Sequence, residues 1–506
     1  MAAGVVALLA FLGVAELVAA AVGPGSAPAI AIGENAIAHT PQDLKEFAIS
    51  HFGENDKNVL LAGIYATLAL MAAVVGLLAS LTRRAVAVVS ICALGAVAAI
   101  SAVTQATASL ADGLPSLAGA LAAVCAVALL LKARPDAPAR ADVGSKVLEA
   151  NTLTRRRFIV AGASVAGAGA ALYAVGSKAL NNIYNATRSR AAVRLPKASN
   201  STPVVGGTGL DVAGLSPYIT PNEDFYRVDT ALVVPQLSTQ SYGLNVHGMV
   251  DEAAIYSFDD LVGMELVERT ITMVCVSNPV GGPYLGNARW TGVLLADLLR
   301  KARPHPGANQ LLMTSSDGMT IGADLATVLD GRPALLALGM NGEPLPFEHG
   351  FPVRAVIPGV YGYASACKWL VDLEVTTFAA KKAYWVQRGY AERAPVKLES
   401  KIDTPASFAQ LKAGPVVVAG AAWNPTVGVK AVQVQVDEGP WHEAALAAVE
   451  SVDTWRLWRW DWDATPGSHS LTVRAVGANG ETQTASQAPV VPNGTSGHES
   501  VVVTVS

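Results

Sequence analysis

Long apolar runs dominate the first third of the chain, and only short runs follow. Five of the long runs reach or approach the roughly 20 residues that an α-helix needs to cross a bilayer. They cover residues 3–22, 59–81, 85–106, 115–132 and 158–178. Basic residues gather after the second run, after the fourth and before the fifth, at Arg83, Arg84, Lys132, Arg134, Arg140, Lys146, Arg155, Arg156 and Arg157. Because basic residues mark the cytoplasmic side, the pattern predicts a membrane domain over 1–179 with an inside amino terminus and an extracytoplasmic remainder.

The predicted spans carry little chemistry. Glu16 is their lone charged candidate, and all eight histidines lie outside them. A haem held by two histidines within the bilayer is therefore excluded, and the spans predict an anchor or docking surface rather than a transporter. A signal peptide is an alternative for the first run, since alanines precede Gly23, but a basic n-region is missing and further spans follow.

The remainder divides by its patterning into three parts. Residues 180–220 are rich in Asn, Ser, Pro, Gly and Thr, which predicts a linker. Short strand-like and helical runs alternate over 221–400, which predicts an α+β domain, and no G-x-G-x-x-G after a strand supports a dinucleotide fold. Over 401–506 strands alternate with Gly, Asn and Pro turns, which predicts an immunoglobulin-like sandwich with the tryptophans at 458, 460 and 462 as a core or interface stripe.

Composition agrees with a multi-domain membrane protein. The chain has 506 residues, a charged fraction of 15% and a mean hydropathy of +0.37. A net charge of −4 leaves no basic surface for nucleic acid. The four cysteines show no paired spacing, which argues against a disulfide framework and against a zinc site.

The fifth run begins with a distinctive basic motif, Thr154-Arg-Arg-Arg-Phe-Ile-Val160, ahead of a helix rich in Gly and Ala. It resembles the twin-arginine export signal, which carries folded proteins that often already hold a cofactor. An ordinary cluster of cytoplasmic basic residues is the alternative. The motif implies the twin-arginine machinery as a partner for this half, with the general export machinery for the preceding spans.

One cysteine stands at the end of a strand-like stretch, Thr270-Ile-Thr-Met-Val-Cys275, followed by Val-Ser-Asn-Pro279 and by Gly286-Asn-Ala-Arg-Trp-Thr-Gly292. A single thiolate at the edge of a rigid strand suits a soft metal or a nucleophile. The alternative is a buried structural cysteine.

Five motifs together resemble the sulfite oxidase family of molybdopterin oxidoreductases. They are the Cys275 loop, Met340-Asn-Gly-Glu-Pro-Leu-Pro-Phe-Glu-His-Gly-Phe-Pro-Val-Arg354, Pro358-Gly-Val-Tyr-Gly-Tyr-Ala-Ser-Ala-Cys-Lys-Trp369, Trp385-Val-Gln-Arg-Gly-Tyr390 and Phe225-Tyr-Arg227. Their order and spacing agree with the family over about 221–506. The resemblance implies a molybdopterin domain, and for 401–506 the family's dimerisation domain, with a homodimer as one arrangement.

The resemblance also implies a cofactor and roles for individual residues. It makes Cys275 the molybdenum ligand, with His349 and Arg354 holding the pterin. It brings Ser365 and Lys368 to the cofactor phosphate and pterin. Their hydroxyl and cationic groups are donors suited to a phosphate. Arg227 and Tyr390 would face the substrate, although Tyr390 can also be read as a packed core tyrosine.

Departures from the family concern the substrate. The residues directly after Cys275, Val276-Ser-Asn-Pro-Val-Gly281, contain no arginine where the family has a pair, Arg227 is followed by Val228-Asp229, Gly389 replaces an aspartate, and the loop 424–430 lacks an arginine. A site with one arginine and an added acid should attract sulfite poorly. The sequence therefore predicts a membrane-anchored, extracytoplasmic molybdenum oxidoreductase that transfers oxo groups to or from a small molecule other than sulfite.

That enzyme would exchange electrons with a separate redox protein or a quinone, and membrane lipid would surround its anchor. Two alternatives stay open. One is a reductase of S- or N-oxides with the same fold, and the other is a non-catalytic membrane interaction protein that retains the fold.

Overall fold

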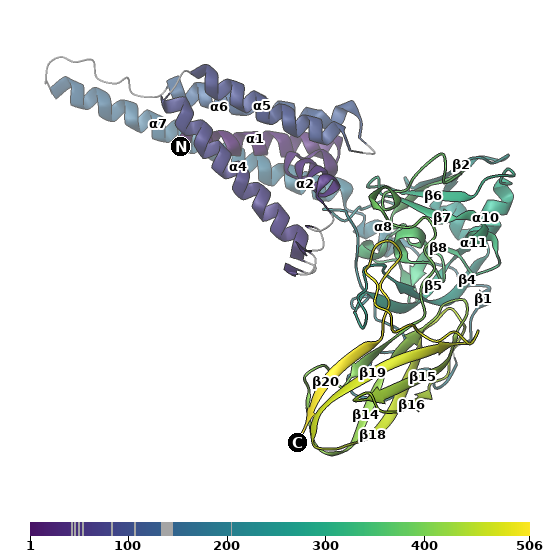
Figure 1. Ribbon diagram of the computed structural model, residues 1–506. Coiled ribbons are helices and arrows are strands. Elements are labelled where there is room, and N and C mark those ends of the chain that lie inside the picture. The colour runs from purple at the N-terminus through teal and green to yellow at the C-terminus, as the bar shows by residue number, and fades with distance from the viewer. Residues whose placement is uncertain are drawn as a thin grey trace. The chain divides into compact units, whose positions relative to one another are not determined.

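The chain forms two compact units (Figure 1). The computed structural model describes residues 1–41, 44, 47, 48, 51, 52, 55–81, 84–105, 108–132, 145–203 and 205–506, with the backbone alone at 56, 79–81, 84 and 145–155. A helical unit comprises Met1–Asn185 and Thr230–Gln236, and a β-rich unit comprises Ala186–Asp229 and Leu237–Ser506. Arg83, Arg134 and Arg140, which helped to predict the orientation, lie outside the described residues.

The helical unit contains five helices that are long and apolar enough to cross a membrane. Its helices are α1 (Ala2–Val22), α2 (Pro28–His39), α4 (Asp56–Leu81), α5 (Arg84–Val103), α6 (Leu114–Lys132) and α7 (Ser145–Tyr184). The five predicted helices are confirmed. The short α2 falls between the first two predicted spans, where Pro28 at the first helical turn favours helix initiation. Helix α7 runs beyond residue 178 because no proline or glycine follows until after Tyr184.

Small residues bring α1 and α7 together. A Cβ atom at Gly169 would collide with the backbone of Leu9, and one at Gly176 would collide with the backbone of Leu17. Glycine therefore allows the two backbones to approach closely, as is common between membrane helices. This packing gives the Gly- and Ala-rich sequence of α7 a structural role.

Two sheets form the first part of the β-rich unit. One has the order β1-β4-β5-β8-β10, with β9 paired to β8, and the other has the order β3-β2-β11-β6-β7. The strands of the first are β1 (Asn200–Ser201), β4 (Leu266–Val274), β5 (Leu285–Leu294), β8 (Leu335–Met340), β9 (Glu343–Pro344) and β10 (Arg354–Val356). Those of the second are β2 (Gly243–Gly248), β3 (Ala254–Ser257), β6 (Gln310–Ser315), β7 (Thr320–Asp324) and β11 (Leu370–Thr376). Short helices connect them, namely α8 (Thr187–Ala192), α9 (Phe258–Val262), α10 (Leu295–Ala302), α11 (Leu325–Leu329) and α12 (Gly362–Ser365).

The core of this part follows from the sequence pattern. Every residue of β8 is buried, as a continuous apolar run predicts for a central strand. The predicted linker over 180–220 differs, because it contains α8 and because β1 pairs in parallel with β4. Backbone hydrogen bonds thus place polar residues in a β-strand, although composition alone predicts a loop for them.

Two further sheets form the carboxyl-terminal domain, which confirms the predicted all-β end. Their orders are β12-β14-β18-β17 and β13-β20-β19-β15-β16. The first contains β12 (Glu399–Thr404), β14 (Gly414–Trp423), β17 (Ala445–Leu446) and β18 (Arg456–Ala464). The second contains β13 (Gln410–Leu411), β15 (Val429–Val436), β16 (Trp441–Glu443), β19 (Gly467–Gly477) and β20 (Glu499–Val505). Trp458 and Trp462 are buried in the core between them, and Trp460 packs against it.

Hydrogen bonds tie this domain to β4, the strand that leads to Cys275. The backbone N–H of Trp455 donates to Oγ1 of Thr272 at 2.7 Å, and Oγ1 of Thr270 donates to Glu450 at 2.5 Å. The indole N–H of Trp455 donates to the carbonyl of Tyr218 at 3.0 Å. The carboxyl-terminal domain therefore supports the strand from which the cysteine loop begins.

Candidate functional site

Cys275 follows the last residue of β4 and opens a tightly bonded loop. Its backbone N–H donates to the carbonyl of Tyr284 at 2.9 Å, and its own carbonyl accepts from the N–H of Asn278 at 3.1 Å. The side chain is buried, and its Sγ lies 3.0 Å from Oγ of Ser277. Burial raises the pKa of the Cys275 thiol, and the hydrogen bond to Ser277 opposes that shift. A nearby positive metal would reverse the shift, because a coordinating thiol loses its proton.

The same loop contains a donor without a partner. Asn278 is 2% exposed, and its Oδ1 accepts from the N–H of Tyr284 at 2.7 Å. Its Nδ2 has no hydrogen-bond partner among the described residues. A buried donor of this kind costs free energy unless a bound group satisfies it, so the loop suits a ligand with acceptor atoms.

Two tyrosines that the sequence did not single out lie near the thiol. Electrostatic interaction with Cys275 contributes to the raised pKa of both Tyr226 and Tyr361, although burial is the larger cause in each. Tyr226 also interacts electrostatically with Arg354. It is therefore close to both the cysteine and Arg354. Its position beside Arg227 in the Phe225-Tyr-Arg motif was the available signal.

Four predicted residues form a cation cluster, which comprises Arg227, His349, Arg354 and Lys368. The pKa of His349 is lowered by burial and by the charges of the other three, which places all four in one neighbourhood. The imidazole Nε2 lies 2.9 Å from the carbonyl oxygen of Asn222. Sequence reasoning missed Asn222, whose only signal is its place just before the Phe225 motif.

A single carboxylate bridges two members of the cluster. Asp229 accepts from Nζ of Lys368 at 2.6 Å and from Nε of Arg227 at 2.8 Å. The carboxylate is 4% exposed, and the side chain of Lys368 is 10% exposed. Asp229, the acidic residue that lies close to Arg227 in the sequence, therefore pairs with Lys368 as well.

Arg354 has no such carboxylate partner among the described residues. Its guanidinium donates to the carbonyl of His349 at 3.1 Å and lies 5.0 Å from the centre of the Trp290 ring. Burial lowers the pKa of Arg354 to about 10 and that of Lys368 to about 8. It also lowers the pKa of His349 to about 4, so the imidazole is neutral at pH 7.

The charges of the cluster fit a bound phosphate. Three cations and one carboxylate leave two positive charges in excess, with His349 neutral. A phosphate monoester carries about −1.5 to −2 charges at neutral pH and forms charge-assisted hydrogen bonds with arginine and lysine. The residues present therefore fit the phosphate-bearing pterin that the motifs imply.

Two other predicted residues are placed differently. Oγ of Ser365 donates within its own turn, to the carbonyl oxygens of Val360 at 2.9 Å and Tyr361 at 3.1 Å. Tyr390 is buried, and its ring lies 5.2 Å from that of Tyr363 and 5.3 Å from that of Trp385. It shares its apolar cluster with the residues on either side of Cys275.

Comparison with known proteins identifies the domain around these residues. Residues 231–385 match the family model described as an oxidoreductase molybdopterin binding domain. The uncharacterized oxidoreductase YuiH of Bacillus subtilis is 34% identical over 152 residues, which cover 30% of this chain and 73% of that protein. Mouse mitochondrial sulfite oxidase is 32% identical over 289 residues, which cover 48% of this chain and 52% of that enzyme. The chain thus spans about half the length of the mouse, rat and fly sulfite oxidases that it matches.

A solved structure shows a similar fold. The sulfane dehydrogenase SoxCD of Paracoccus pantotrophus aligns with a TM-score of 0.50 and 23% identity, over 57% of this chain and 84% of that chain. The cofactor expected from the sequence, molybdenum-molybdopterin, is confirmed by the family match. The chain belongs to the sulfite oxidase family of molybdopterin-binding oxidoreductases.

Proposed function

We propose that this oxidoreductase is anchored in the membrane by its helical unit and performs two-electron oxo transfer outside the cytoplasm on a small molecule other than sulfite. When bound, the cofactor supplies the two-electron redox chemistry and the transfer of an oxygen atom. A separate electron partner, either a redox protein or a quinone, completes the reaction. The twin-arginine motif supports export of the folded half, with insertion of the preceding spans by the general export machinery.

The pairing of Asp229 carries the substrate proposal. A site for a small dianion needs cations that are not already neutralised. Here the carboxylate accepts from both Arg227 and Lys368. The two positive charges left over in the cluster are assigned to the cofactor phosphate, and residues 276–281 after Cys275 contain no arginine. The charge available to attract sulfite is therefore small, and a substrate of low charge fits better.

Each residue of the site has a proposed task. Cys275 is the thiolate ligand of the metal, and the loop bonds described above hold it in place. Arg354, Lys368 and Ser365 bind the cofactor phosphate, and neutral His349 can donate or accept at the pterin edge. Arg227 orients the substrate.

A tyrosine hydroxyl then moves a proton to or from the reacting group. The resemblance to the family assigns this role to Tyr390. Tyr226 is a second candidate, because it interacts electrostatically with Cys275.

Metal analysis of the full-length protein, purified after export, tests the enzyme. We expect about one molybdenum atom per chain in the native protein, and little or none in Cys275→Ser, with the fold retained by tryptophan fluorescence. Molybdenum near zero in the native protein, or full oxo-transfer activity in the variant, would contradict the proposal. A non-catalytic interaction protein predicts the first of these results.

Assays with a panel of substrates test which small molecule the enzyme uses. Initial rates with sulfite, S-oxides and N-oxides are compared in the native protein and in Asp229→Asn. We expect poor use of sulfite by the native protein and a lower KM for sulfite in the variant, because removing the carboxylate releases positive charge. Efficient sulfite oxidation by the native protein would refute the substrate proposal, and turnover of S- or N-oxides alone would favour the reductase.

A further inference from the structure

A polar cluster lies among the membrane helices, formed by Glu16 of α1, Tyr65 of α4, and Tyr173 and Ser177 of α7. Oγ of Ser177 donates to Glu16 at 3.1 Å, and the hydroxyls of Tyr65 and Tyr173 lie 3.3 Å apart. Glu16 is close enough to Tyr65 for an electrostatic interaction. The cluster therefore joins a carboxyl group and three hydroxyls from three helices.

The cluster lies deep enough to be surrounded by hydrocarbon. Glu16 is six residues from the end of α1 at Val22, and Tyr65 is eight residues from Lys57, where its span begins. At 1.5 Å per residue these separations are about 9 Å and 12 Å, within a hydrocarbon layer about 30 Å thick. An ionisable residue at such a depth is rare and is a functional site by default.

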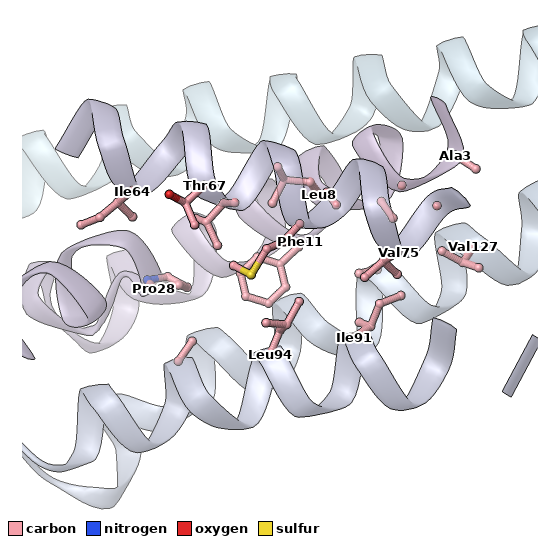
Figure 2. A pocket seen from close by; sticks show the side chains of 18 of the residues that line it. Ala3, Leu8, Phe11, Pro28, Ile64, Thr67, Val75, Ile91, Leu94 and Val127 are labelled. Atoms are coloured by element: carbon pink, nitrogen blue, oxygen red, sulfur yellow. The ribbon is translucent and has the colours of Figure 1, made fainter. Parts of the chain in front are cut away.

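An apolar cavity of about 920 Å³ occupies the same helical unit (Figure 2). Its walls come from α1, α2, α4, α5 and α6, with Phe158 of α7. Thr67 is the one lining residue with a polar side chain, and its hydroxyl donates to the carbonyl of Gly63 at 2.8 Å. The cavity is at the upper end of the range for small-molecule sites, and the contacts that it offers an occupant are mostly apolar.

We propose that the helical unit binds an isoprenoid quinone, with its ring at the polar cluster and its tail in the cavity. The carbonyl oxygens of a quinone accept hydrogen bonds from tyrosine hydroxyls, and the hydroxyls of a quinol donate to a carboxylate. Helices α1 and α4, which carry Glu16 and Tyr65, also supply residues to the cavity wall, among them Phe11 and Ile64. A quinone with its ring at the cluster and its tail in the cavity would therefore contact both of these helices.

A phospholipid fits less well. Its charged head group belongs at the membrane surface, whereas the cluster lies below it, and the carboxylate of Glu16 would repel a phosphate. Use of the quinone as the electron partner rests on the proposed function, but the binding itself does not.

Equilibrium binding of a ubiquinone analogue with a decyl tail to the full-length protein in detergent micelles tests the proposal. We expect Tyr65→Phe to weaken binding of the analogue's quinone form and Glu16→Gln to weaken binding of its quinol form, each about tenfold, as for one lost hydrogen bond of about 1.4 kcal/mol. Gly63→Leu should also weaken binding by filling the cavity, since a Cβ atom at Gly63 meets no other atom within 4 Å.

Two controls should bind as the native protein does. Ser90→Ala removes a hydroxyl on α5 that donates to the carbonyl of Val86. Gly167→Leu adds a side chain on α7 at a position that is also open but does not line the cavity. No quinone binding by the native protein, equal binding by all variants, or recovery of a phospholipid in place of quinone would overturn the proposal. Cys275→Ser should bind quinone normally, which separates this result from the fate of the enzyme proposal.

Discussion

His349 should make the β-rich unit sensitive to mild acid. Its pKa is lowered from 6.5 to about 4, mainly by burial and further by three nearby cations. Because the folded pKa is depressed, the unfolded chain binds the proton first as the pH falls. The stability that neutral His349 provides is therefore fully present above pH 6.5 and is lost as the pH falls toward 4. A shift of this size corresponds to at most about 3 kcal/mol.

Denaturant unfolding of the full-length apoprotein in detergent measures this loss. All nine tryptophans lie at or beyond Trp290, so their fluorescence reports on the β-rich unit. His349→Gln keeps an amide that can donate to the carbonyl of Asn222 but cannot titrate. We expect the fall in unfolding free energy between pH 6.5 and 4 to be smaller in the variant by up to about 3 kcal/mol.

A second histidine provides a control of opposite sign. His469 lies 2.6 Å from a carboxylate oxygen of Asp437, which raises the pKa of the imidazole. Its contribution is present below the unfolded pKa and is lost as the pH rises through the folded pKa. His469→Gln should therefore lower stability in acid.

Parallel stability curves for the native protein and His349→Gln from pH 7 to 4 would refute the reasoning.

Three further substitutions test other parts of the structure. Asp229→Asn should destabilise the apoprotein by about 3–5 kcal/mol, because largely buried Lys368 and partly buried Arg227 lose their carboxylate, and an unchanged melting temperature would contradict this. Arg354→Met should leave the apoprotein as stable or more stable by about 1–4 kcal/mol while the molybdenum content falls, so loss of both would indicate a structural role. Gly169→Leu should lower the temperature of the helical transition in far-UV circular dichroism, whereas the matched change Gly167→Leu should not.

The sequence predicts the helices and the strand before Cys275 well, because hydrophobic periodicity is a local property. A run of apolar residues is buried either in a membrane or in a protein core, and its length predicts which of the two. The order of the domains and the cofactor could also be predicted, since the motifs that carry them are contiguous in the chain. Periodicity does not determine which distant strands pair, so the pairing of β1 with β4 could not be predicted.

The ion pairs of the site were harder to predict. Asp229 and Lys368 are 139 residues apart, and only the folded chain brings them within 2.6 Å. The same holds for Tyr226, whose place near Cys275 depends on how two loops meet. Burial also lowers the pKa of His349 and of Lys368 and leaves His349 neutral at pH 7, and a sequence shows residue types without their solvent exposure.

The segment Thr230–Gln236 has a practical consequence for dissection of the protein. It directly follows Asp229, yet it belongs to the helical unit, where Leu232 lies so close to Gly33 of α2 that a Cβ atom at Gly33 would collide with it. A protease cut after Asn185 would therefore release a fragment that still contains a membrane-unit segment. A shortened protein beginning at Ala186 would expose the apolar side chains of Ala231 and Leu232, which are buried in the intact chain. Polar replacements at these two positions are the rational starting point for a water-soluble version of the β-rich unit.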